Sequence, residues 1–337
     1  MRNHDIVIIG SSAGGVYALR KLVKSFSPGI RAAIFVVQHV AADTSSFLPH
    51  ILSREGKLSA VHPADGEPVK PGNIYVAPPD HHMIISAGKI LVQKGPKENL
   101  FRPSIDALMR SAAHEYGPRV IGVVLTGMLD DGTSGLWSIK RLGGVSIIQT
   151  PEDAMFPDMP LNVLQYVDVD YNVPLDDLGS LINRLIDEPV VINKSLSEEM
   201  LDRMELKAKI ADRENAFKNE VMEIGKTTSL TCPECGGAML SFEEGSVVRY
   251  RCHTGHAYTS DFLIKELTEL IEAKLWQCLR SMEEVIMLLD QSVSQSEKAG
   301  READASEFSK KSKKLRDRAS ELLDFIYHKG QPDLNEL

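Results

Sequence analysis

The stretch DIVIIGSSAGG, residues 5–15, decides the fold of the first half of this chain. A run of β-formers at 6–9 ends at Gly10, and an amphipathic stretch at 16–26 follows the glycine-rich turn. A hydrophobic strand, a tight turn and a helix in this order are typical of the first unit of a parallel α/β sheet. The turn contains two serines as well as its glycines, so it could hold a phosphate group or present a nucleophile.

The spacing of the glycines matches neither phosphate-binding motif. A dinucleotide fingerprint requires G-x-G-x-x-G, whereas this turn has Gly10, Gly14 and Gly15. A P-loop requires a lysine directly after its last glycine, and Val16 occupies that position. Without the lysine, the terminal phosphates of a nucleotide lack their charge partner. The alternative to a functional turn is that the glycines only let the chain turn against the sheet.

Composition limits the classes of protein to which this chain can belong. With 337 residues, 43% of them hydrophobic, it is long enough for two domains with hydrophobic cores. A formal net charge of -9 argues against extensive binding to nucleic acid or to an anionic membrane. We find no signal-peptide pattern, no apolar run of transmembrane length and no secreted disulfide framework among the four cysteines. We therefore expect a soluble, cytoplasmic protein with no membrane insertion and no nucleic-acid partner.

Residues 1–190 alternate between strand-like and helix-like segments. The hydrophobic strands are nearly continuous, which is typical of a parallel sheet covered on both faces. The pattern predicts a doubly wound, mostly parallel α/β sheet with helices on both faces and an antiparallel insert near residues 73–93. We expect strands at 6–9, 32–38, 73–77, 83–86, 90–93, 120–125 and 145–149, and helices at 17–26, 47–53, 105–116, 135–142 and 178–186.

The sequence changes character after residue 190. Apolar residues spaced three or four apart predict two long helices near the end of the chain, with a break at Gly300 and with Cys278 in their core. The expected parts are a charged helix (195–219) and a linker within 191–230, a turn-rich unit with three cysteines at 231–258, and a helical hairpin at 259–337 with helices at 260–290 and 303–327.

Three strands present polar side chains at the same edge of the predicted sheet, where ligands bind in open α/β folds. A serine, a histidine and an aspartate are the set required for acyl transfer, as nucleophile, base and orienting acid. Each also has a structural alternative, since serines cap helices, histidines bond at strand ends and aspartates form turns. The order Ser, His, Asp differs from that of α/β-hydrolases, and the elbow G-x-S-x-G is absent. The residues at this edge are Ser11, Ser12, Gln38, His39, Asp130 and Asp131.

Six segments between residues 3 and 187 carry a resemblance to a known family. They read IIGSSAGGVYALRKL, VVQHV, EPVKPGNIYVAPPDHHM, RPSIDALMRSAA, GVVLTGMLDDGTSG and FPDMP. In this order they resemble the catalytic domain of CheB-type protein-glutamate methylesterases. The resemblance implies a doubly wound α/β domain with a Ser-His-Asp triad, which hydrolyses γ-glutamyl methyl esters on chemoreceptor helices and in some members deamidates glutamines. Members of the usual design begin with a receiver domain, and we expect this chain to act without one.

The resemblance also implies the identity of the triad. It makes Ser12 the nucleophile, His39 the base and Asp131 the orienting acid. The family usually has threonine after the nucleophile and asparagine before the aspartate. This chain has Ala13 and Asp130 at those positions, so the surroundings of the triad are expected to differ.

Three further residues are implied as parts of the active site. The backbone at Ala13 and at Met128 is expected to help form an oxyanion hole. Arg102, in the segment RPSID, is expected to hold the substrate, and a structural ion pair is the alternative role. Catalysis by this set requires no cofactor.

The cysteines of the turn-rich unit have the spacing of metal ligands. Cys232-x2-Cys235 is followed, after sixteen residues, by Cys252-x3-His256, and two such pairs match tetrahedral zinc coordination. His253 is adjacent to Cys252 and would need a tighter chelate. We expect structural zinc on the first four residues, because a unit this small has little core of its own. The alternatives are a ribbon that has lost its metal and a cluster of reduced thiols.

Together these patterns predict a serine hydrolase that removes methyl esters from glutamate side chains and releases methanol. The expected partner is a methylated chemoreceptor or receptor-like signalling protein, served by a cognate methyltransferase. The competing hypothesis is a signalling scaffold, in which a zinc ribbon and a helical hairpin bind partners and the esterase domain is vestigial.

Overall fold

The structure is a computed structural model that describes residues 3–43, 45–190, 225–244 and 247–328. The chain divides into two compact units, Met1–Phe262 and Leu263–Leu337. The first unit contains the α/β domain and the cysteine-rich unit, and the second contains most of the helical hairpin. The charged helix expected at 195–219 lies outside the described residues.

A seven-stranded parallel sheet forms the middle of the α/β domain. Its strand order is β10 (Tyr171–Val173), β9 (Val145–Gln149), β8 (Val120–Val124), β1 (Ile6–Ser11), β2 (Ala33–Gln38), β5 (Asn73–Val76) and β3 (Ser59–Val61). Every pairing in this sheet is parallel. From β1 the chain builds the sheet first on one side and then on the other, so the predicted doubly wound fold is confirmed.

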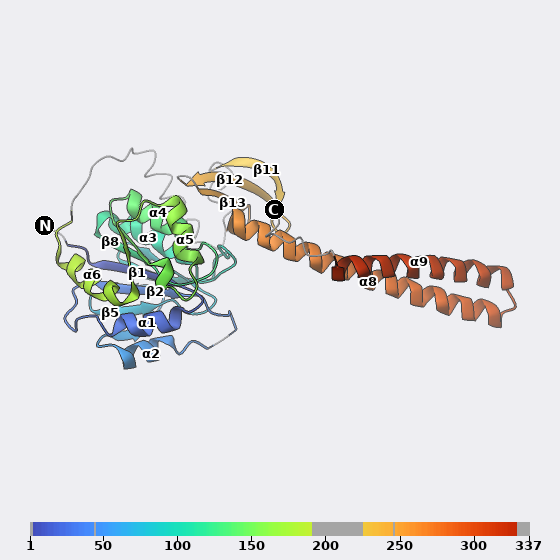
Figure 1. Ribbon diagram of the computed structural model, residues 1–337, viewed down its shortest axis with the longest axis horizontal. Coiled ribbons are helices and arrows are strands. Elements are labelled where there is room, and N and C mark those ends of the chain that lie inside the picture. The colour runs from blue at the N-terminus through green and yellow to red at the C-terminus, as the bar shows by residue number, and fades with distance from the viewer. Residues whose placement is uncertain (1–2, 44, 191–224, 245–246, 329–337) are drawn as a thin grey trace. The chain divides into compact units, whose positions relative to one another are not determined.

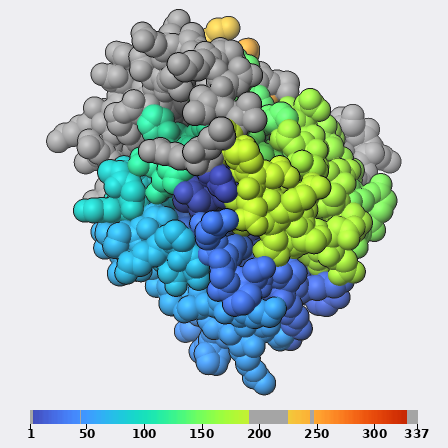
Figure 2. Space-filling view, turned by 90° about the vertical axis from the view of Figure 1, so that its left-hand side faces the viewer, coloured from blue at the N-terminus to red at the C-terminus, as the bar shows by residue number. Residues whose placement is uncertain are grey.

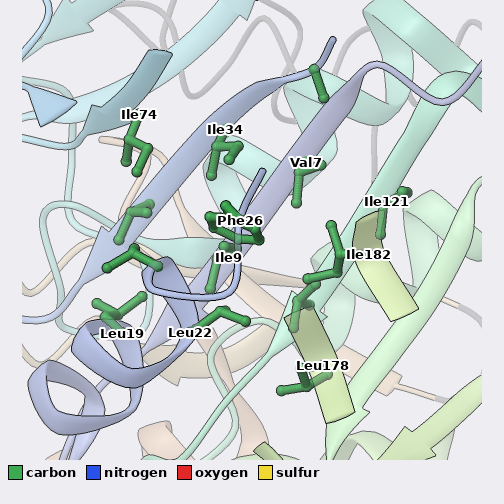
Figure 3. Close-up of a cluster of buried hydrophobic side chains, with 14 of the residues drawn as sticks. Val7, Ile9, Leu19, Leu22, Phe26, Ile34, Ile74, Ile121, Leu178 and Ile182 are labelled. Carbon is green, nitrogen blue, oxygen red and sulfur yellow. The ribbon is translucent and has the colours of Figure 1, made fainter. Parts of the chain in front are cut away.

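Helices cover both faces of this sheet. One face carries α1 (Gly15–Val23), α2 (Leu48–Glu55) and α6 (Leu175–Asp187), and the other carries α3 (Ile105–Tyr116), α4 (Thr133–Arg141) and α5 (Asp158–Tyr166). In Figure 1, α1 and α2 lie on one side of the strands and α3, α4 and α5 on the other. Because side chains alternate along a strand, Val7 and Ile9 pack toward α1 whereas Ile8 packs toward α3. Figure 3 shows the first of these cores, where Leu19 and Leu178 meet the strands.

A small antiparallel sheet is formed by one strand before β5 and two strands after it, so the antiparallel insert expected near residues 73–93 is confirmed for 82–93 but wrong for 73–76, which is the parallel strand β5. This sheet consists of β4 (Glu67–Pro68), β7 (Lys89–Gln93) and β6 (His82–Ser86), in that order. Two single 3-10 turns lie elsewhere in the domain, at Gly117–Arg119 and Pro151–Asp153. The sequence pattern did not predict β3, β10 or α5. The two strands have only three residues each, which is too short for a period. Helix α5 contains Pro160, which is tolerated because first-turn N–H groups lack helical partners.

The first and last residues of the α/β domain lie side by side. Asn3 forms an isolated bridge with Pro189, and Arg31 forms an ion pair with Asp187. Figure 2 shows this face, where the dark blue N-terminal atoms adjoin the yellow-green atoms of α6. The α/β fold is therefore complete by residue 189.

The cysteine-rich unit is a four-stranded antiparallel sheet. Its strands are β11 (Lys226–Thr231), β12 (Ala238–Glu244), β13 (Val247–Cys252) and β14 (Ala257–Thr259), in that order. The linker expected up to residue 230 is wrong at its end, because β11 pairs with β12 there. β11 is a polar edge strand with a single partner, so its sequence, KTTSLT, contains little of the hydrophobic pattern that marks a strand.

Two long helices joined at Gly300 form the predicted hairpin, and they extend a little further than expected. They are α8 (Ser260–Lys298), which begins in the first unit, and α9 (Glu302–His328). Gly300 has a positive φ of 67°, which suits glycine at a helix end. Cys278 is exposed, so its expected place in the core is wrong, and the buried position belongs to the next residue, Leu279. The described helices include none with the length and apolarity of a membrane span.

Candidate active site

The carboxyl ends of three adjacent strands bring together the predicted serine, histidine and aspartate. Ser12 follows β1, His39 follows β2, and Asp131 lies in the loop between β8 and α4. β1 pairs with both β2 and β8 in parallel, so all three strands end at the same edge of the sheet. This edge, where the strand order reverses around β1, is the usual ligand-binding position of doubly wound folds.

These three side chains form a continuous hydrogen-bonded chain. Ser12 Oγ lies 3.2 Å from His39 Nδ1, and His39 Nε2 lies 2.8 Å from Asp131 Oδ2. The side chains of His39 and Asp131 are only 3% and 0% exposed. An aspartate anion accepts the Nε2 proton, which leaves Nδ1 of the neutral ring as an acceptor for the hydroxyl of Ser12. The arrangement can therefore remove a proton from the serine.

The imidazole of His39 is also held by an aromatic ring. Phe101 stacks on it with 3.7 Å between ring centroids and an angle of 7° between the planes. The serine faces Nδ1 here, whereas in the chymotrypsin-type triad it faces Nε2. Either orientation supplies one nitrogen that donates to the acid and one that accepts from the nucleophile.

Asp131 is the most heavily bonded member of the set. Within the described part of the chain, five groups donate to its carboxylate. Burial opposes ionisation, but the hydrogen bonds from His39, the Ile105 N–H and Asn99 hold the pKa of Asp131 below its ordinary value. Its position is set by the first turn of α3, where two backbone N–H groups lack helical partners. The donors are His39 Nε2, Asn99 Nδ2, Ser104 Oγ and the backbone N–H groups of Ile105 and Asp106.

The two serines of the first turn have different environments. Ser11 is buried at the end of β1, and its hydroxyl donates to Gln38 Oε1 at 2.8 Å. The amide of Gln38 in turn donates to the backbone carbonyls of Ser12 and His39. Ser11 and Gln38 therefore tie the first two strand ends together, and the hydroxyl that faces His39 is that of Ser12.

The two residues expected in an oxyanion hole lie on loops that are bonded to each other. Ala13 follows Ser12 in the turn before α1, and Met128, which is 51% exposed, lies in the loop after β8. Thr126 joins these loops, because its hydroxyl donates to Ala13 O at 3.0 Å and its carbonyl accepts from the Ser12 N–H at 3.0 Å. The expected roles of Ala13 and Met128 stay predictions.

Arg102, which the resemblance assigns to the substrate, is engaged by the protein. Its Nε donates to Asp80 Oδ1 at 2.9 Å, and its guanidinium also donates to Gly95 O. A hydrogen bond from Lys94, together with the pairing to Arg102, lowers the pKa of Asp80 to about 2. A substrate group at this arginine would have to compete with Asp80, and the substrate role stays a prediction.

Four side chains that hold the triad were not identified from the sequence. Ser104 and Asp106 lie in the segment RPSIDALMRSAA, and Ser104 is recognisable as the cap of α3. Asn99 and Phe101 lie just before that segment, where the sequence shows no motif. Their contribution becomes visible only through contacts in the folded chain.

The predicted metal ligands also come together. The ligand atoms of Cys232, Cys235, Cys252 and His256 all lie within 4.8 Å of one another. The sulfurs of Cys235 and Cys252 are 3.7 Å apart, and His256 Nδ1 lies 3.6 Å from the sulfur of Cys232. Two thiolates on a tetrahedral zinc ion are about 3.8 Å apart when each Zn–S bond is about 2.3 Å. The donor set and its spacing therefore fit zinc, with His256 rather than His253 as the fourth ligand.

Comparisons with known proteins agree with this fold. A family model described as CheB methylesterase matches residues 7–182. A relative from Leptospira interrogans is 34% identical over 184 residues, which are 54% of this chain and 95% of that protein. Protein-glutamate methylesterase/protein-glutamine glutaminase 2 from Methanosarcina mazei is 35% identical over 190 residues, and this chain spans only 52% of its length. The crystal structure of the Thermotoga maritima CheB methylesterase catalytic domain is 34% identical and has a TM-score of 0.52, covering 55% of this chain and 100% of that one.

Proposed function

Because this chain belongs to the CheB methylesterase family, we propose that it hydrolyses methyl esters of glutamate side chains in proteins, with Ser12 as nucleophile, His39 as base and Asp131 as orienting acid. The observation that carries the proposal is the hydrogen-bonded chain, with 3.2 Å between the partly buried Ser12 and His39 and 2.8 Å between His39 and the buried Asp131. A hydroxyl, a neutral imidazole and a carboxylate in this order are the groups that acyl transfer requires.

The first half of the reaction forms an acyl-enzyme. His39 Nδ1 takes the proton of Ser12 as Oγ attacks the ester carbonyl, and Asp131 stabilises the resulting imidazolium. Backbone N–H groups at Ala13 and Met128 are proposed to donate to the negatively charged oxygen of the tetrahedral intermediate. When this intermediate collapses, the C–O bond to the methoxy group breaks, and His39 returns its proton to that group. Methanol leaves, and the glutamyl group stays on Ser12.

Water completes the cycle. His39 removes a proton from a water molecule that attacks the acyl-enzyme, and the second tetrahedral intermediate releases the glutamate carboxylate and restores the hydroxyl of Ser12. With a glutamine side chain the leaving group is ammonia instead of methanol, and the remaining steps are unchanged. The double name of the Methanosarcina mazei relative supports both reactions for the same site. None of these steps needs a cofactor.

The proposed substrates are methylated chemoreceptors or receptor-like signalling proteins, whose methyl groups a cognate methyltransferase would add. The family resemblance supports this class of partner. Structural zinc on Cys232, Cys235, Cys252 and His256 is proposed to stabilise the cysteine-rich unit, which is supported by the closeness of the four ligand atoms. Arg102 is retained as a proposed substrate contact.

Methanol release from methylated receptor membranes tests the proposal. The wild-type protein should release methanol, Ser12→Ala should lower the rate by roughly 10³-fold or more, and Ser11→Ala should have a mild effect. Ser11 is a matched control because it is the neighbouring serine, with its hydroxyl bonded to Gln38. A fluorophosphonate should label the wild-type protein at Ser12, since an activated serine reacts and a capping serine does not. Absence of both labelling and methanol release would favour the scaffold hypothesis instead.

A further inference from the structure

The cysteine-rich unit reaches the acid of the triad through one buried arginine. Arg249 lies on β13, and its side chain is 1% exposed. Its guanidinium donates to Asp106 Oδ2, and also to Asn99 Oδ1 at 3.3 Å. Both partners touch Asp131, because Asn99 Nδ2 and the backbone N–H of Asp106 donate to Asp131 Oδ1. A single side chain thus separates Arg249 from the carboxylate that holds His39.

The cysteine-rich unit contributes to the orientation of Asn99, whose Nδ2 also donates to Asp106 Oδ2 at 3.0 Å. The backbone N–H of Asn99 donates to Ala257 O at 2.8 Å. Asn99 and Leu100 have positive φ values of 49° and 69°, and the left-handed conformation is unfavourable for a leucine unless contacts hold it. A guanidinium only donates hydrogen bonds, so Arg249 requires the carbonyl oxygen of the Asn99 amide on its side. The NH2 group is then directed at Asp131, 2.9 Å away.

The segment that contains Asn99 also supports the base. Phe101, which stacks on His39, contacts Phe262 edge-on with 6.0 Å between the ring centroids. Phe262 lies in the first turn of α8 and belongs to the same compact unit as the α/β domain. Asn99 and Phe101 therefore lie between the triad on one side and Arg249, Ala257 and Phe262 on the other.

Arg249 further supplies a charge beside Asp131. The carboxylate of Asp106 is completely buried, and this burial raises its pKa. The positive charge of Arg249 lowers that pKa, whereas the negative charge of Asp131 raises it further. Asp106 Oδ1 accepts from the backbone N–H groups of Gly132 and Gly135, at 3.0 and 2.7 Å. Asp106 thereby anchors the loop that carries Asp131. Without the guanidinium of Arg249, the buried carboxylate of Asp106 would keep only the more distant Arg110, whose Nη1 lies 4.0 Å from Asp106 Oδ2, and would be poorly compensated next to the acid of the triad.

We propose that Arg249 is a positioning residue for the triad, acting through Asn99 and Asp106 on Asp131, so that the cysteine-rich unit is a working part of the active site. The inference rests on the proposed esterase function, since it concerns how that triad is held. It adds a requirement that the α/β domain by itself does not meet, because β13 supplies the arginine.

Three variants of the full chain separate this role from simple loss of packing. Arg249→Met removes both the charge and the hydrogen bonds. Arg249→Lys keeps a charge for Asp106 but lacks the planar group that bonds Asp106 and Asn99 together. Arg251→Met is the matched control, because Arg251 lies on the same strand, is 5% exposed, and donates to Glu98 and to the Gly255 carbonyl, neither of which donates to Asp131. Glu98 also lies 3.6 Å from Arg249 Nη2, so both variants disturb that carboxylate and only Arg249→Met removes the bonds to Asn99 and Asp106.

The measurements are kcat and KM on a small activated ester, the downfield proton resonance of His39 Nε2–H, and the unfolding temperature. We expect Arg249→Met to lower kcat roughly 10- to 100-fold with little change in KM, since displacement of a catalytic group by about 1 Å has an effect of this size. Its downfield resonance should weaken or move. Arg249→Lys should recover part of the kcat and part of the downfield resonance. Arg251→Met should retain both the kcat and the resonance, even if it unfolds at a lower temperature.

Equal kcat losses in Arg249→Met and Arg251→Met, or an unchanged resonance in Arg249→Met, would overturn the inference. If Arg249→Met does not fold, Arg249→Lys decides, and wild-type kcat in that variant overturns it as well. Failure of the proposed function would look different, because the wild-type protein itself would then neither hydrolyse the ester nor react with the fluorophosphonate.

Discussion

Replacing Asp131 by asparagine keeps the size of the side chain but puts an NH2 group, which donates hydrogen bonds, in place of one of its two acceptor oxygens. At the Oδ1 position, an NH2 group would face three donors, from Asn99, Ser104 and the Asp106 N–H. At the Oδ2 position it would face two, the Ile105 N–H and His39 Nε2. Since His39 can change tautomer and backbone N–H groups cannot, we expect the NH2 group at the second position, donating to Nε2.

The size of the effect follows from that tautomer. When Nε2 accepts a hydrogen bond from the introduced amide, the ring proton moves to Nδ1, which then points at Ser12 and can no longer take its proton. The corresponding change in a serine protease triad lowers kcat by about 10⁴-fold, or about 5 kcal/mol at 1.36 kcal/mol for each factor of ten. The Ile105 N–H also loses its acceptor, which should lower the free energy of unfolding by about 1–3 kcal/mol.

The assay is hydrolysis of a small activated ester, well below the unfolding temperature of the variant. Asp130→Asn is the control, because Asp130 is the adjacent buried carboxylate and accepts from Thr259 Oγ1, which an asparagine can also do. We expect its kcat to remain within a few-fold of wild type. The reasoning is refuted if Asp131→Asn retains a tenth or more of the wild-type kcat, or if Asp130→Asn is the more damaging change.

Three further predictions concern metal, pH and packing. Protein purified without a His tag should contain about one zinc ion per chain by elemental analysis, and Cys232→Ser should lose it and unfold at a lower temperature; a metal-free wild type would contradict this. Burial raises the pKa of Asp130 from 3.8 to about 7, so the stability from its bound proton is complete below about pH 4 and is lost as the pH rises through 7. The unfolding temperature of Asp130→Asn minus that of the wild type should therefore increase between pH 5 and pH 8. A difference that stays constant over this range would contradict the raised pKa of Asp130. Gly15→Ala should destabilise the fold by roughly 1–3 kcal/mol in denaturant unfolding, because its Cβ would lie 2.1 Å from Gln38 Oε1, whereas Gly29→Ala, with nothing within 4 Å, should not.

Local pattern was sufficient for much of the α/β domain. The run at 6–9 predicted β1, and the continuous hydrophobic strands predicted a parallel sheet, because buried strands need apolar side chains on both faces. Short elements escaped this reasoning, since three-residue strands such as β10 contain less than two full periods. β11 escaped it for another reason, because an edge strand in a small sheet can remain polar.

The sequence by itself determined which residue types reach the edge of the sheet. Strand ends in a parallel sheet meet at one edge, so two serines, His39 and two aspartates could be grouped from their positions, and the family resemblance selected Ser12 and Asp131 among them. The spacing of Cys232, Cys235, Cys252 and His256 likewise predicted four side chains that come together within one small unit and could hold a metal ion. Both predictions depend on short-range pattern and on a general rule of sheet geometry.

Only the tertiary structure decided how the triad is supported. In the folded chain the hydroxyl of Ser11 donates to Gln38, and Arg102 bonds to Asp80. Arg249 bonds to Asp106, although the two residues are 143 positions apart in the sequence. Such contacts produce no periodic pattern in the sequence, because the arginine and its partners each follow the local pattern of their own helix, strand or loop. A buried carboxylate needs a compensating charge, but which cation supplies it depends on how distant segments fold against one another.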